Sequence, residues 1–225
     1  FTLDETTKTS QKVEAVKRYF AEAPHDDAAW ALWFLIGDSI KRTVPTAKLK
    51  EWAALAAGIP GWLIDECNEA VGDVAETIAL LLPAADGVSS PLGLRAAVEG
   101  RLLLLQDDDE TSLRNSILGT WREMDDRQRL VWNKMITGDL RVGISRQTII
   151  RALGELAGLE ASVISHRIMS AWEPAGEFFR WLLSPDRGEA DVSRPYPLQL
   201  AFPLEALPET LGDRHQWCAE WKRDG

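Results

Sequence analysis

Apolar residues recur every three or four positions along most of the chain, in stretches separated by residues that start or end helices. Near the N-terminus, Val13, Val16 and Phe20 keep this spacing after Ser10, a residue that favours a helix start. Further helix-starting and helix-ending residues follow in series at Asp26, Gly37, Pro45, Gly58, Pro60, Asp73 and Pro83. The pattern predicts a row of amphipathic α-helices, without the alternation typical of a strand.

The same pattern continues after a predicted loop at 84–90 and indicates six more helices. Their expected ranges are 91–106, 110–124, 126–137, 146–157, 161–172 and 175–183. Most tryptophans fall on the apolar faces of the predicted helices, so we expect them in the core rather than stacked on bases. Examples are Trp30, Trp33, Trp52, Trp62 and Trp132.

The last part of the chain has a different character. Prolines at 195, 197, 203 and 208 forbid a long helix, and this composition is typical of an extended linker. Trp217, Ala219 and Trp221 then alternate with other residues, as a strand would. We expect an all-α domain over 1–184, and over 185–225 a linker with the first strand of a truncated following domain.

A faint internal repeat relates the two halves of the predicted helical domain. The pair Gly37-Asp38 recurs 101 residues later as Gly138-Asp139. At the same offset, Leu55-Ala56 recurs at Leu156-Ala157, and Glu76 with Leu81-Leu82 recurs at Glu177 with Leu182-Leu183. Two similar halves with matching basic loops could contact two neighbouring stretches of a duplex backbone.

Composition indicates an ordinary globular protein, with 225 residues that are 45% hydrophobic and 27% charged. No apolar run approaches the roughly 18 residues of a membrane span, and the N-terminus lacks a signal peptide, so we expect a cytoplasmic protein without membrane contact. The two cysteines and three histidines are scattered, and we expect no bound metal. Because the sequence starts at Phe1 rather than Met, we expect it to be a piece of a longer protein.

The net charge of −10 is unevenly distributed. Residues 65–110 hold eleven acidic side chains against two basic ones, whereas 8–50 hold eight basic against five acidic, and 122–151 hold seven basic against four. Two basic segments in an acidic body can form a one-sided phosphate-binding face, although solvated helix surfaces are the commoner meaning of such runs.

One loop carries the strongest candidate for phosphate binding. It combines two glycines, two arginines and a helix-capping serine just before a predicted helix, and exposed N–H groups at a helix N-terminus attract anions. The residues are Gly138, Arg141, Gly143, Ser145 and Arg146. Their counterparts in the first half are Lys41, Arg42 and Thr43. A purely structural interpretation stays open, in which the glycines and serine cap helices and the arginines lie in water.

Four segments match known motifs in order along the chain. Gly72–Thr77 is similar to a G-D-x-A-E segment, and Leu140–Ser145 to an L-R-I-G segment. Arg194–Ala201 is similar to a K-P-M-L-A-type segment, and Glu220–Gly225 to the E-x-K-x-D-G nucleotidyl-lysine motif. In this order the segments resemble the bacterial ATP-dependent DNA ligases, in which the third leads into the adenylation domain. Arg223 departs from the family pattern, which usually has an aromatic residue at that position. The resemblance covers nearly the whole chain.

The resemblance implies a helical DNA-binding domain with two pseudo-symmetric halves that grips nicked double-stranded DNA through its phosphates. Lys222 would be the catalytic nucleophile that accepts AMP, and Glu220 would bind the amine of adenine. The loops named above would contact DNA. ATP and Mg²⁺ would serve the full-length enzyme, whereas this fragment alone is expected to bind neither and to be inactive. It also implies a monomer, with roles in DNA repair, recombination and replication.

Two other classes of function remain compatible with the sequence. A helical scaffold for protein–protein interactions would fit the repeat and the acidic surface, with the terminal motif an accident. An RNA-directed nucleotidyltransferase shares the K-x-D-G pattern, although about 200 preceding residues of predicted helix favour a DNA ligase.

Overall fold

The computed structural model describes residues 8–40, 44–83, 92–106, 109–138, 140, 143–169, 171–185 and 212–213. All regular structure within these residues is helical, which confirms the predicted all-α fold class. The expected linker and strand after residue 185 lie outside the described residues, apart from 212–213.

The helices follow one another with short connections. They are α2 (Thr9–Glu22), α3 (His25–Leu35), α4 (Thr46–Ala57), α5 (Gly61–Val71), α6 (Val74–Leu81), α7 (Leu94–Ala97), α8 (Glu110–Glu123), α9 (Asp126–Thr137), α10 (Arg146–Ala157), α11 (Ala161–Arg167) and α12 (Gly176–Leu182). A π-helical turn (Val98–Leu102) and a 3₁₀ turn (Leu103–Gln106) continue α7.

Two of the predicted ranges differ from the structure. The single helix expected over 91–106 is broken into α, π and 3₁₀ turns, and Gly100 in its middle weakens regular α-helix. The helix expected over 161–172 ends at Arg167, where the N–H of Met169 bonds to the carbonyl of His166 in a tighter turn. The expected boundaries of α9 and α10 match the structure.

Local capping explains why these boundaries could be predicted. At the start of α9, Asp125 accepts a hydrogen bond from the N–H of Gln128, whose side chain accepts one from the N–H of Asp125. At its end, Gly138 adopts a left-handed conformation with φ of 70° and bonds to the carbonyl of Met135. These contacts lie within a few residues of each other, so they depend little on the rest of the fold.

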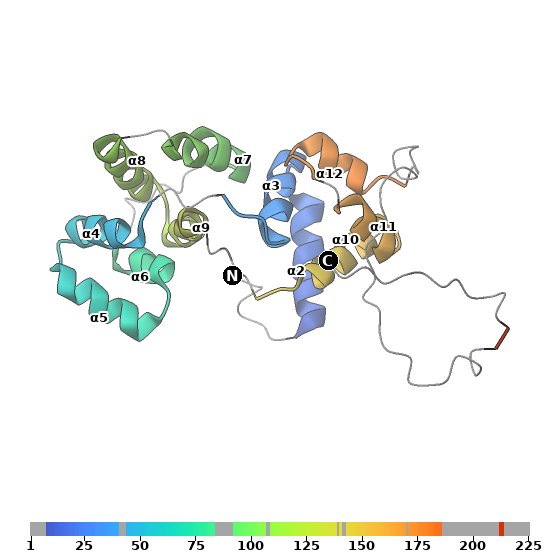
Figure 1. Ribbon diagram of the computed structural model, residues 1–225, viewed down its shortest axis with the longest axis horizontal. Helices are drawn as coiled ribbons and strands as arrows, with labels where there is room; N and C mark the ends of the chain where they lie inside the picture. Colours follow the sequence, from blue (N-terminus) through green and yellow to red (C-terminus); the bar gives the residue numbers. More distant parts are fainter. Residues whose placement is uncertain are drawn as a thin grey trace.

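The helices form two bundles, each with its own hydrophobic core (Figure 1). The first bundle contains α4, α5, α6, α8 and α9, with α7 beside it. The second bundle contains α2, α3, α10, α11 and α12. Helix α3 contributes to both cores, because Trp30 and Phe34 face the first and Ala28 and Leu32 face the second.

The internal repeat is visible in the helix register. Helices α2 and α3 begin 101 residues before α8 and α9, and α4 begins 100 residues before α10. Buried positions recur in the same way, such as Leu49 with Ile149 and Ile64 with Ile164. The offset becomes 100 because the connection from Gly138 to Ser145 is one residue shorter than that from Gly37 to Pro45. The predicted match of Leu55-Ala56 with Leu156-Ala157 at 101 is therefore out of register with α4 and α10.

The two halves exchange helices between the bundles. Helices α2 and α3 of the first half pack against α10 and α12 of the second, while α9 of the second half packs against α6 of the first. Each bundle therefore combines two helices of one half with three helices of the other. The chain must cross between the bundles after α3 and again after α9.

Candidate nucleic-acid interface

The chain crosses between the bundles in residues 36–45, the first crossing, and in residues 138–145, the second crossing, and the described start of each crossing lies beside that of the other. A cavity of about 250 Å³ is lined by Gly37 and Asp38 from the first crossing and by Gly138 and Leu140 from the second. A Cβ atom on Gly138 would lie 3.6 Å from the carbonyl oxygen of Ile40. Gly37 and Gly138, which the sequence relates by an offset of 101 residues, therefore lie close together in space.

An ion pair holds the end of α9 that leads into the second crossing. The Nζ of Lys134 lies 2.8 Å from the Oδ2 of Asp73, which also caps α6 by accepting a hydrogen bond from the N–H of Glu76. Although partial burial opposes it, the hydrogen bond from Lys134 and that from the Glu76 N–H hold the pKa of Asp73 below its usual value. This charge pair joins the two halves just before Gly138.

The second crossing ends at the exposed N-terminus of α10. The Oγ of Ser145 accepts a hydrogen bond from the N–H of Thr148 at 3.2 Å and so caps the helix. The guanidinium of Arg146, which is exposed, donates one 3.3 Å hydrogen bond to the carbonyl of Ile168. Helix α10 has 12 residues, and the positive end of its dipole faces outward beside this arginine.

A lysine from the other half of the chain supports this loop. The Nζ of Lys12, on α2, donates a hydrogen bond to the carbonyl of Gly143 across a separation of 131 residues. Sequence reasoning placed Lys12 in a basic stretch and missed this contact, because nothing in the sequence signals that α2 and the second crossing are neighbours. Two cations, Lys12 and Arg146, therefore lie beside the α10 N-terminus.

The structure places only part of the predicted site. Gly138, Gly143, Ser145 and Arg146 lie together on the second crossing, and Gly143, Ser145 and Arg146 are exposed. The remaining predicted residues lie outside the described residues and stay predictions: Lys41, Arg42, Thr43, Arg141, Glu220 and Lys222.

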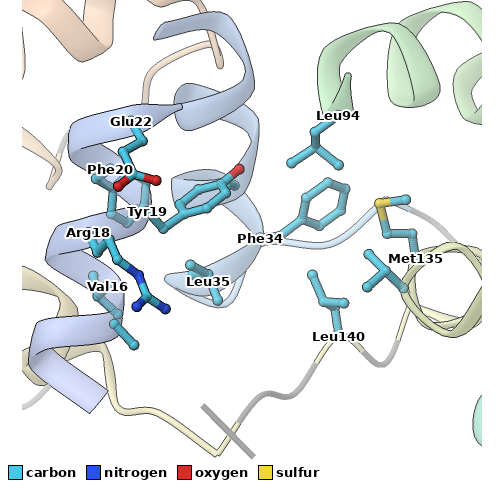
Figure 2. Close-up of a pocket in the computed structure, with 13 residues that line it drawn as sticks. Val16, Arg18, Tyr19, Phe20, Glu22, Phe34, Leu35, Leu94, Met135 and Leu140 are labelled. Carbon is cyan, nitrogen blue, oxygen red and sulfur yellow. The ribbon is translucent and has the colours of Figure 1, made fainter. Parts of the chain in front are cut away.

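An apolar groove that the sequence did not predict opens beside the crossings (Figure 2). It has a volume of about 370 Å³ and is lined mainly by side chains from α2, α3 and α9, including Tyr19, Phe34 and Met135. Burial and the nearby Asp27 carboxylate raise the pKa of Tyr19 to about 12, so its phenol stays protonated at neutral pH. The charged side chains of the lining are Arg18 and Glu22, both from α2.

The described residues contain neither a candidate metal site nor a helix suited to a membrane. Within the described ranges, no group of three or more His, Cys, Asp or Glu side chains is arranged to hold a metal ion. Among the helices described, none combines the length and apolar character that crossing a membrane requires.

Comparison with known families identifies the chain. The family model for the DNA ligase N terminus matches residues 2–154, about two thirds of the sequence. The match spans α2 to most of α10 and so includes both crossings. The chain therefore belongs to the N-terminal domain family of ATP-dependent DNA ligases. A comparison with curated proteins found no significant match.

Proposed function

We propose that this chain is the DNA-binding part of an ATP-dependent DNA ligase and that it grips nicked duplex DNA at the two crossings. The observation that carries the proposal is the exposed, capped N-terminus of α10 at the end of the second crossing, which begins at Gly138, where that residue meets Gly37 and Asp38 of the first crossing. Backbone N–H groups, the helix dipole and the cations Lys12 and Arg146 all favour a phosphate there.

Binding of this kind does not read sequence. Phosphates are the same at every base pair, so contacts to them position the protein without distinguishing bases. Arg141 of the second crossing and Lys41, Arg42 and Thr43 of the first extend the same surface in our proposal. The acidic stretch between 65 and 110 belongs mostly to the first bundle, so it need not oppose contact at α10.

We further propose that Lys222 carries the chemistry of the full-length ligase. Its deprotonated Nζ attacks the α-phosphorus of ATP, the N–P bond forms, and pyrophosphate leaves. AMP then passes to the 5′-phosphate of the nick, and the 3′-hydroxyl displaces it to seal the strand. Glu220 binds the adenine amine, and Mg²⁺ offsets the phosphate charge. The enzyme acts as a monomer in the cytoplasm, in DNA repair, recombination and replication.

A salt titration with labelled nicked duplex tests the DNA-binding proposal. Affinity should fall steeply as salt rises, and Arg146→Ala should weaken binding about fivefold and reduce the slope of log K against log salt by about one. Arg114→Ala, which removes an exposed arginine of α8, is the matched control and should change neither. Equal affinity of the Arg146→Ala and Arg114→Ala proteins for nicked duplex, or an affinity that does not change with salt, would refute the proposed interface. A nicked RNA duplex of the same sequence should compete poorly; strong competition would support an RNA-directed enzyme.

Labelling with α-labelled ATP and Mg²⁺ tests the role of Lys222. The full-length protein should retain AMP in an acid-labile bond, and Lys222→Ala should lose both the label and nick sealing. The 225-residue chain alone should not be labelled, because orientation of ATP requires groups from the rest of the adenylation domain. Label that persists in the Lys222→Ala protein would assign the nucleophile to another residue.

A further inference from the structure

Helix α5 exposes a face that the fold does not use. Ile64 is the only buried residue of this helix, while Trp62 is 66% exposed. Trp62, Glu66 and Glu69 are spaced at i, i+4 and i+7, so they share one face, and both glutamates are exposed. The expectation that Trp62 belongs to the core is wrong, because the core contact of α5 is on its opposite side.

The other half of the chain provides an internal comparison. Helix α11 occupies the equivalent place in the second bundle, and Ile164 is buried there as Ile64 is in α5. The positions equivalent to Trp62, Glu66 and Glu69 are Ser162, His166 and Met169. Because α11 makes the same core contact without a tryptophan or a carboxylate at these positions, packing does not require them in α5.

Of the three positions on this face, only the middle one differs in burial between the halves, because Ser162 and Met169 are exposed as Trp62 and Glu69 are. His166 is buried in the second bundle, whereas the equivalent Glu66 is exposed in the first. Leu55 and Leu80, on helices that pack against α5, are also exposed. Large exposed apolar side chains are typical of protein-binding surfaces, and tryptophan is enriched among the residues that dominate protein–protein binding.

The charge of this face indicates what it binds. Asp65 is paired with Lys50, but Glu66 and Glu69 have no ion-pair partner among the residues described. Uncompensated carboxylates repel DNA and attract cations, and an exposed indole ring binds guanidinium and ammonium groups over its face. Figure 1 shows α5 at the outer end of the first bundle, whereas α10 lies in the second.

We propose that Trp62, Glu66 and Glu69 form a docking surface for an arginine- and lysine-rich segment of a partner protein. An arginine of the partner stacks on Trp62 while neighbouring cations pair with the two glutamates. The partner binds independently of DNA, since the crossings remain free. It can thereby recruit the ligase to a site or retain it there.

Fluorescence anisotropy with a labelled oligo-arginine peptide tests this surface on the intact chain. Trp62→Ser, which installs the residue found at the equivalent position of α11, should weaken binding about thirtyfold, as loss of a tryptophan hot spot does. The double variant Glu66→Gln with Glu69→Gln should weaken binding about tenfold and reduce its salt dependence. Glu177→Gln, which neutralises an exposed glutamate of α12, is the charge-matched control and should bind as the unmodified chain does.

Hydrogen exchange locates the bound peptide. Amides of 61–71 should exchange more slowly when the peptide is present, and those of 161–167 should not change. Nicked-duplex affinity should be the same in all of these proteins, so failure of the proposed DNA interface would not affect the result. Peptide binding that survives both the Trp62 and the double glutamate substitutions, or protection confined to other helices, would overturn the assignment.

Discussion

Substitution of Arg129 by methionine should destabilise the first bundle strongly. Arg129 lies on α9 and its side chain is 3% exposed. Its Nε donates a 2.6 Å hydrogen bond to the carbonyl of Trp121 at the end of α8, and its Nη1 donates one of 2.6 Å to the carbonyl of Pro83 after α6. This one side chain therefore joins a helix end from each half of the chain.

The magnitude follows from the groups that lose their partner. Hydrogen bonds from a charged donor are each worth about 1.5–3 kcal/mol, and methionine cannot replace either of them. Burial lowers the pKa of Arg129, despite the nearby Asp126 and Asp125 carboxylates, so desolvation of the cation offsets part of the gain. We expect a net loss of about 3–5 kcal/mol, a large share of the 5–15 kcal/mol that a typical domain has.

Urea unfolding followed by circular dichroism measures this loss. The midpoint should fall for Arg129→Met, whereas Arg114→Met, at an exposed position of α8, should change stability by less than about 0.5 kcal/mol. Because the two bundles have separate cores, hydrogen exchange should accelerate more in α6 and α8 than in α2 and α10. A loss below about 1 kcal/mol for Arg129→Met would show that its hydrogen bonds barely exceed the desolvation cost.

Two further perturbations test polar contacts that join α9 to neighbouring helices of the first bundle. Trp121→Phe should cost about 2 kcal/mol more than Trp132→Phe in unfolding free energy. The buried indole of Trp121 donates a 2.7 Å hydrogen bond to Asn133, whereas that of Trp132 has no partner among the described residues. Equal costs for the two variants would contradict this reasoning. Asp73→Asn should cost about 1 kcal/mol at pH 7 and less near pH 3. The folded-state pKa of Asp73 is lowered, so the contribution of its carboxylate to stability is present above about pH 4 and is lost as pH falls through the folded pKa. If urea unfolding shows the same loss of stability for Asp73→Asn at both pH values, the result would argue against the pair with Lys134.

The sequence by itself determined the features that depend on residues close together along the chain, such as helix boundaries and motifs. The capping box of Asp125 and Gln128, and Gly138 at the end of α9, fix that helix through contacts only a few residues apart. Apolar spacing supplied the all-α fold class, and the ordered motifs supplied the resemblance that the family match confirms. The Gly-Asp repeat indicated two related halves, because it too is a pattern along the chain.

Only the tertiary structure decided which helices pack together. An apolar face indicates that one side of a helix is buried, but many other apolar faces could pack against it. The sequence therefore did not reveal that the halves exchange helices. Phe34 and Leu32 are apolar residues of the same helix, yet they face different bundles. The contact of Lys12 with Gly143 and the exposure of Trp62 have the same origin, since each depends on where distant helices lie rather than on residues nearby in sequence.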